Sequence, residues 1–192
     1  DSNSALSDII GVSVYKHQSF SITPLSDNIV GGFLTDVFTG AGADVTSADS
    51  MDGGADNDTL RINSGALNLN TSTAAGIKRI ENFQLNSNAN HVLTIHDGYF
   101  TGLNGNTVTV TTTATTAGIT VTNAATSANN IIHVIGGGGS DSLTGGASAD
   151  TLEGGVGADT LNGGADNDFI SYANDTVGVS VNLATGVGSG GE

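Results

Sequence analysis

Short stretches in the middle of the chain alternate apolar and polar residues, with glycine, asparagine, serine and aspartate between them. Alternation with a period of two sends neighbouring side chains to opposite faces, so each stretch predicts a half-buried β-strand. These predicted strands lie at 66–70, 82–86, 91–96, 107–113, 118–123 and 130–135. Their spacing is typical of a β-solenoid or a β-sandwich. Helix is scarce, and the best candidate, residues 73–83, is interrupted by Gly76.

From Gly136 the pattern becomes strictly periodic, as four nonapeptides follow one another without a gap: GGGGSDSLT, GGASADTLE, GGVGADTLN and GGADNDFIS. Paired glycines permit the strained backbone of a tight turn, and the last three residues of each unit predict a short strand. The eighth place is always aliphatic and should point inward: Leu143, Leu152, Leu161 and Ile170. The sixth place is always aspartate: Asp141, Asp150, Asp159 and Asp168.

A second, more degenerate array is predicted at residues 27–60. The hexapeptide GGADND of the last nonapeptide also occurs at 53–58, where it again leads into a short apolar segment. We expect the two hexapeptides to form equivalent turns. Irregularly spaced aspartates around the first copy indicate an interrupted array of metal-binding turns. Its candidate ligands are Asp36, Asp44, Asp56 and Asp58.

Charge restricts the partners that this chain can have. Nineteen acidic residues against four basic ones give a formal net charge of −15. Such a surplus opposes compaction unless cations neutralise it, and it repels the phosphate backbone of nucleic acid. Nucleic acid binding is therefore not expected. Membrane insertion is not expected either, because no apolar run has the length of a membrane span. Without cysteine, disulfides and thiolate metal sites are excluded, which leaves metal ions bound by oxygen as staples.

The nonapeptides resemble the RTX calcium-binding repeat G-G-x-G-x-D-x-U-x, closely over 136–171 and more loosely over 27–60. The resemblance implies a parallel β-roll in which two nonapeptides form one coil, so that Asp141 stacks on Asp159 and Asp150 on Asp168. It also implies several calcium ions between stacked turns, bound by these aspartates and by turn residues, because calcium prefers about six to eight oxygen ligands. The turn residues concerned, at the second and fourth places, are Gly137, Gly139, Gly146, Ser148, Gly155, Gly157, Gly164 and Asp166.

Ser148 and Asp166 depart from the fourth-place glycine of the repeat, and Asp166 either adds a ligand or lies in solvent. The apolar core of the repeats is small compared with the conformational entropy of ordering 36 residues, and stacked aspartates repel one another. We therefore expect this segment to fold on binding calcium.

The fold class predicted is all-β: a parallel β-solenoid, or RTX β-roll, with calcium-binding turns and a strand-rich spacer between two repeat arrays. The predicted segments are an N-terminal strand segment (1–26), the degenerate array (27–60), a solenoid or sandwich spacer (61–135), the β-roll (136–171) and a connecting segment (172–192). The chain begins at Asp1 and closes on glycines typical of a loop, so we expect it to be part of a longer protein.

Other candidate chemistry is weak. HExxH and GxSxG motifs are absent, so neither a zinc protease nor a serine hydrolase is expected, and the chain is not predicted to be an enzyme. His91 and His96 flank one predicted strand and should point to opposite faces, which disfavours a shared metal site. Lys78 and Arg79 are interpreted as a solvated turn that offsets acidic charge; the alternative is a docking point for the acidic surface of another copy.

The order of array, spacer and array is similar to that of bacterial surface-layer proteins and other large RTX exoproteins. This resemblance implies a calcium-stabilised structural protein outside a Gram-negative cell, which folds and self-assembles on binding calcium. The expected partners are further copies, through solenoid ends and faces, and cell-surface polysaccharide. The alternative is a calcium-triggered folding and type I secretion module of a larger exoenzyme or adhesin.

Overall fold

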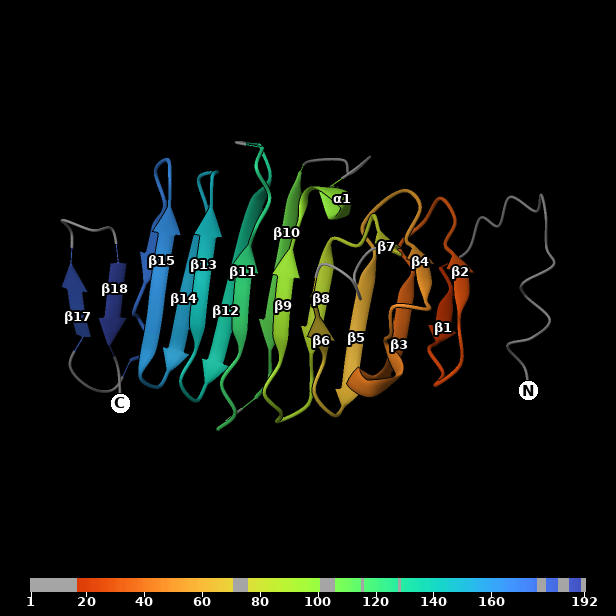
Figure 1. Cartoon of the computed structure of the whole chain (residues 1–192), viewed down its shortest axis with the longest axis horizontal. Coiled ribbons are helices and arrows are strands. Elements are labelled where there is room, and N and C mark those ends of the chain that lie inside the picture. The colour runs from red at the N-terminus through yellow and green to blue at the C-terminus, as the bar shows by residue number, and fades with distance from the viewer. Residues whose placement is uncertain are drawn as a thin grey trace.

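The structure, a computed structural model, describes residues 17–70, 76–100, 106–114, 116–127, 129–175, 179–182 and 187–190. Short strands cross the long axis of the molecule and stack side by side along it (Figure 1). Much of the predicted N-terminal strand segment lies outside the described residues, as do parts of 172–192.

One side of the solenoid is an eight-stranded sheet in which every neighbouring pair of strands is parallel. Its strands, in spatial order, are β1 (Ser19–Ser21), β3 (Val37–Ala41), β5 (Thr59–Ser64), β8 (Asn82–Leu85), β10 (Thr107–Thr112), β12 (Ile131–Gly138), β14 (Thr151–Val156) and β16 (Phe169–Ser171). The sheet passes through both repeat arrays and the spacer between them.

The other side consists of two sheets. A three-stranded parallel sheet contains β2 (Asn28–Val30), β4 (Ser50–Asp52) and β7 (Ile77–Lys78). A seven-stranded sheet contains β6 (Asn68–Leu69), β9 (Val92–Ile95), β11 (Thr120–Asn123), β13 (Ser142–Gly146) and β15 (Asp159–Gly164) in parallel. It ends in the antiparallel strands β18 (Val187–Gly190) and β17 (Val179–Asn182).

The chain alternates between the eight-stranded sheet and the opposite side, so the spacer is a continuation of the solenoid and not a sandwich. In the C-terminal repeats one coil takes 18 residues, as the resemblance implied: Leu143 pairs with Leu161, and Leu152 with Ile170. Towards the spacer the hydrogen-bonded partners of neighbouring coils are 22, 23 or 24 residues apart. The coil therefore widens in the middle while the sheet register continues.

A continuous apolar row runs along the inside of the eight-stranded sheet, because period-two alternation places the same strand position inward in each coil. The parallel register stacks these residues one above another: Phe20, Phe38, Leu60, Phe83, Val110, Val134, Leu152 and Ile170. Aromatic side chains fill the wider coils, where Phe83 meets Tyr99 edge to face at 5.6 Å between ring centroids. In the C-terminal 18-residue coils leucine and isoleucine take this place.

Helix is limited in the described residues to the 3-10 turn η1 (Gly42–Asp44) and the single turn α1 (Asp97–Phe100). The helix candidate at 73–83 is wrong where it is described, since Ile77–Lys78 form β7 and β8 begins at Asn82. Pairing of both segments with neighbouring coils overrides their weak local helix preference.

Phe83→Ala should lower the free energy of unfolding by about 3–5 kcal/mol, because it empties a fully buried site in the widest part of the core. Phe169→Ala is the matched control: that side chain is 62% exposed, and its removal should change stability by no more than about 0.5 kcal/mol. Chemical denaturation in saturating calcium measures both, and equal losses would contradict the assigned core.

Candidate metal sites in the glycine and aspartate turns

Aspartates at the start of the strands connect one coil to the next. Each aspartate turns Oδ1 towards the preceding coil, where it accepts a backbone N–H. The amide of Asp141 donates to Oδ1 of Asp159 at 2.8 Å, and that of Asp150 donates to Oδ1 of Asp168 at 2.9 Å. The implied stacking of these two pairs is present.

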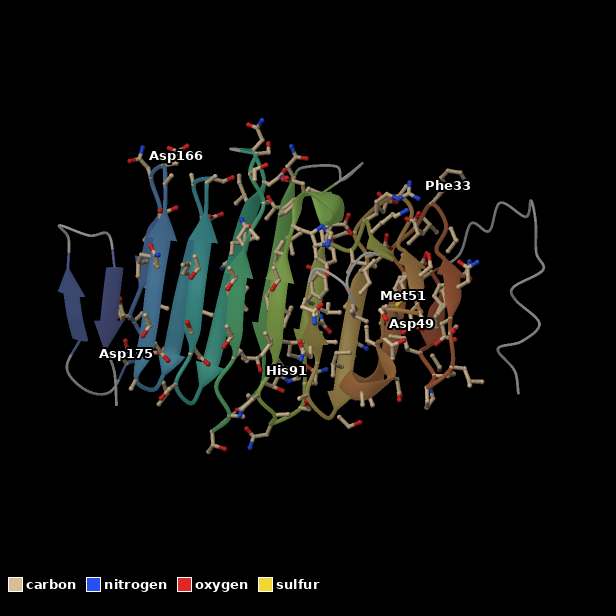
Figure 2. The ribbon with its side chains drawn as sticks, in the orientation of Figure 1. Phe33, Asp49, Met51, His91, Asp166 and Asp175 are labelled. Atoms are coloured by element: carbon tan, nitrogen blue, oxygen red, sulfur yellow. The ribbon has the colours of Figure 1, made fainter. Side chains whose placement is uncertain are left out.

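The aspartates form two ladders, one on each edge of the solenoid. The first ladder precedes strands of the eight-stranded sheet and comprises Asp36, Asp58, Asp150 and Asp168. The second lies at the start of strands of the seven-stranded sheet and comprises Asp141, directly before β13, and Asp159, the first residue of β15. Figure 2 shows the two edges: Asp166, next to the first ladder, lies on the opposite edge from Asp175.

The two GGADND hexapeptides form equivalent turns, as expected from the sequence. Their second glycines, Gly54 and Gly164, have φ values of 103° and 101°, and their fourth-place aspartates, Asp56 and Asp166, have φ values of 70° and 73°. Left-handed backbone at both places favours glycine first and tolerates aspartate second. In the first copy the amide of Asp36 donates to Oδ1 of Asp58 at 2.7 Å, as in the C-terminal ladders.

The second carboxylate oxygen of four ladder aspartates has no partner. Oδ2 is shielded from solvent and accepts no hydrogen bond among the described residues in Asp58, Asp141, Asp150 and Asp159. Burial disfavours an unpaired charge, so it raises the pKa of Asp58, Asp141 and Asp150 to about 7 and also raises that of Asp159. A buried anionic oxygen without a hydrogen-bond partner is suited to bind a cation.

Glycine at the first place of each turn leaves room for this oxygen. A Cβ added to Gly136 would overlap both Oδ2 of Asp141 and the carbonyl oxygen of Gly154 in the next coil. Gly145 is in the same position with respect to Asp150 and the carbonyl of Gly163. Carboxylate and carbonyl oxygens of stacked turns therefore converge on space that a side chain would fill.

This donor set fits calcium, a hard cation that binds carboxylate and carbonyl oxygens in flexible turns. Backbone carbonyls supply many of the oxygens, which agrees with the absence, in the part of the chain described, of any cluster of three or more acidic, histidine or cysteine side chains. No lysine or arginine follows Arg79 in the sequence, so the C-terminal aspartates have no basic side chain to neutralise them.

Other predicted ligands lie in different surroundings. Oδ2 of Asp36 accepts the amide of Gly32 at 2.7 Å, and Asp168 is half-buried. Asp56 and Asp166 are exposed at the tips of their turns. Asp44 lies in η1, away from both ladders.

Ser148 replaces the fourth-place glycine of its turn and is fully buried. Its hydroxyl lies 3.1 Å from the carbonyl of Ser127 and 2.9 Å from that of Asn130, to which it donates. The departure from glycine thus ties the first coil of the β-roll to the end of the spacer.

Sequence analysis did not identify several other residues that accept an amide of the preceding coil, as the ladder aspartates do. Asp49 binds the amide of Asp27 through Oδ1 at 2.9 Å, while Glu81 binds the amide of Asp58 through Oε2 at 2.6 Å. His91 is fully buried, and its Nδ1 accepts the amide of Leu67 at 3.0 Å. Burial lowers the pKa of His91, which favours the neutral ring needed to accept this bond. The sequence signal that could have identified these residues is a side chain able to accept a hydrogen bond, placed directly before a strand.

Lys78, at the end of β7, is exposed, and Arg79, directly after it, is half-buried and offsets acidic charge, as interpreted from the sequence. The guanidinium of Arg79 donates to both carboxylate oxygens of Asp52, at 2.5 and 2.6 Å. The charge of Arg79 is thus paired within the chain. The carbonyl oxygen of Arg79 lies close to Gly53, just as the carbonyl oxygen of Gly154 lies close to Gly136.

Beyond Glu81 and His91, the next coils of the spacer carry apolar residues in the ladder positions. Val108 and Ile132 stand in line with Glu81 and Asp150 on the first edge, and Ile119 stands in line with Asp141 on the second. Side chains hold the turns instead of metal: Asn88 accepts the amides of Thr116 and Ala117 at 3.2 and 3.0 Å. Oδ1 of Asp97 accepts the backbone amide of Thr126 at 3.1 Å and the side-chain amide of Asn130 at 2.7 Å.

A comparison with family models matches four copies of the RTX calcium-binding nonapeptide repeat, at residues 46–66 and 135–170. This chain is an RTX-type repeat protein. Its repeats bind calcium, several ions to an array, and the matches cover both GGADND turns. Comparisons with curated proteins and with solved structures gave no match. RTX repeat proteins are typically secreted, and none of the helices described is long and apolar enough to cross a membrane.

Without metal, the RTX protein should be more folded in acid than at neutral pH. The pKa values of about 7 for Asp58, Asp141 and Asp150 lie above the ordinary 3.8. The protonated carboxyls thus stabilise the fold fully below about pH 4, and this contribution is lost as the pH rises through about 7. Far-UV circular dichroism of metal-depleted protein measures the trend.

Added salt is the control for this trend, because salt screens surface repulsion but not buried groups. Calcium should reverse the trend and release protons below about pH 7, since its ligands must be deprotonated. Metal-depleted protein that gains structure as the pH rises would contradict the assignment.

Asp141→Asn separates the two roles of the carboxylate. Asparagine can keep the 2.7 Å acceptor for the amide of Ile119 but removes the charge at the Oδ2 position. The calcium midpoint of folding should rise by about tenfold or more, and the metal-free protein should be at least as stable as the wild type. Asp44→Asn removes one charge away from the ladders and should leave the midpoint unchanged. An equal response of both variants would show that only net charge matters.

Proposed function

We propose that this RTX chain is a structural module outside the cell, which folds on calcium and then assembles with further copies into a surface layer or matrix. The proposal gives the chain no catalytic role, since the RTX β-solenoid is a structural, calcium-binding fold. A Gram-negative cell surface is the proposed location.

Calcium-dependent folding is supported by the ladders. Three of the four unpartnered Oδ2 atoms lie in the C-terminal array, in Asp141, Asp150 and Asp159. All of them follow the last basic residue of the chain, Arg79. Cell interiors keep free calcium low, so a chain with these turns would stay unfolded until it reached calcium outside.

Assembly is supported mainly by the two ends of the eight-stranded sheet. Among the residues described, no strand pairs with the outer side of β1 or of β16. Exposed apolar side chains accompany both ends: Leu25 and Val30 near the first coil, and Val156 and Phe169 near the last. All strands of this sheet are parallel, so β16 of one copy can continue into β1 of the next. Such head-to-tail contacts do not close and extend into filaments or layers.

Cell-surface polysaccharide is the second proposed partner. The outward strand positions carry neutral hydrogen-bonding side chains, among them Thr109, Thr122 and Asn162. Hydroxyl and amide groups of this kind suit sugar hydroxyls and do not depend on charge.

One observation favours the alternative, a calcium-triggered folding and secretion module of a larger exoenzyme or adhesin. The seven-stranded sheet reverses direction at its C-terminal end, where β18 pairs antiparallel with β15 and β17 with β18. A reversed hairpin ends the parallel repeat on that side of the solenoid. A module whose sheet ends in this way does not need a second copy to cover that edge.

Sedimentation and far-UV circular dichroism during a calcium titration, with magnesium as the control ion, distinguish the two functions. Strand formation with growing particle mass supports assembly, whereas folding with constant mass at high protein concentration supports the alternative. Phe169→Lys should prevent mass growth without changing the calcium midpoint, because it charges the free edge of the sheet. Val92→Lys charges an exposed side position far from both ends, as the matched control. Equal effects of the two variants would rule out contact through the ends.

A further inference from the structure

Beyond the last glycine turn, the second ladder continues into a turn that is not an RTX repeat. The register that pairs Glu153 with Ser171 places the segment Tyr-Ala-Asn-Asp, residues 172–175, against the turn that begins at Gly154. The side-chain amide of Asn174 donates to Oε1 of Glu153, which holds the two turns together. Residues 172–175 follow the match to the family model, which ends at 170.

Buried oxygen atoms without partners collect between these two turns. Asp159, 1% exposed, contributes Oδ2. Asp175 contributes both carboxylate oxygens and Tyr172 its hydroxyl, and none of them has a hydrogen-bond partner among the described residues. Figure 2 shows Asp175 at the C-terminal end of the edge that carries the second ladder.

The three side chains interact electrostatically. Burial raises the pKa of Asp159, and the charge of Asp175 raises it further. Burial and then the charges of Asp175 and Asp159 raise the pKa of Tyr172. Two interacting carboxylates without a counter-ion destabilise a fold, and no lysine or arginine follows Arg79 in the sequence to supply one.

We propose that Asp175, from outside the repeats, joins Asp159 in binding the last calcium ion of the second ladder, beside the hydroxyl of Tyr172. The two carboxylates supply the charge, and carbonyls of the stacked turns supply further oxygens, as a hard cation requires. Tyr172 and Asp175 occupy places that hold glycine in the preceding turn, so the site takes one ligand from outside the repeats. The site rests on calcium binding by the repeats and is independent of assembly.

Terbium tests the site, because this ion takes calcium positions and emits light when an excited tyrosine lies close to it. The full chain is depleted of metal, titrated with terbium, excited at tyrosine and then challenged with calcium. We expect sensitised emission that calcium abolishes. Tyr172→Phe should remove it, whereas Tyr99→Phe, which alters a tyrosine packed against Phe83 in the core, should retain it.

Asp175→Asn should also remove the emission, and calorimetry should count one fewer calcium ion than for Asp44→Asn, which removes one charge elsewhere. Circular dichroism in saturating calcium verifies that each variant folds; Tyr172→Phe, which removes a single hydroxyl, tests the site even if Asp175→Asn does not fold. Full emission from Tyr172→Phe, or an unchanged calcium count in Asp175→Asn, would overturn the site. A wild-type chain that binds calcium without any terbium emission would do so too, and would leave the repeats and the assembly proposal untouched.

Discussion

The structure depends on an aspartate whose two carboxylate oxygens have different environments. Oδ1 accepts an amide of the preceding coil and so fixes the distance between turns, as Asp159 does for Asp141. Oδ2 is buried over a glycine and has no partner among the described residues, so its charge requires a cation. The other features of the nonapeptide follow from this. Glycine avoids an overlap of its Cβ with Oδ2, the turn reverses the chain, and the eighth-place aliphatic residue points into the core.

The spacer meets the same geometric requirement with few carboxylates in the ladder positions. Its coils are longer, its ladder positions hold residues such as Val108 and Ile119, and its turns are joined by Asn88 and Asp97. Larger side chains fill the wider interior, which gives these coils more apolar burial than a leucine row provides. A solenoid is stabilised mainly by contacts between neighbouring coils. The centre of this one is therefore the part least dependent on metal, and the two arrays extend from it.

Much of this could be predicted from periodicity. The 18-residue coil, the inward leucines and the equivalence of the two GGADND turns all follow from residues that repeat at fixed places. The spacer strands were also predictable, but not their stacking, because coil lengths vary and register is set by contacts between distant residues. Asp44 could not be set apart from the ligands by sequence, since GAGAD also joins glycines to an aspartate, and only the structure places it in η1. Glu81 and His91 were missed because an acceptor can replace aspartate in the ladder without matching the motif.

The orientation of the strands has a mechanical consequence. Since the strands cross the long axis, the hydrogen bonds between coils run along it (Figure 1). A pulling force applied from one end to the other therefore loads every junction between coils in series, and the weakest junction determines the strength of the whole. Metal-free turns would be that junction. The ambient calcium concentration would then set the tensile strength of the rod, with the spacer as the segment that still resists when the arrays have yielded.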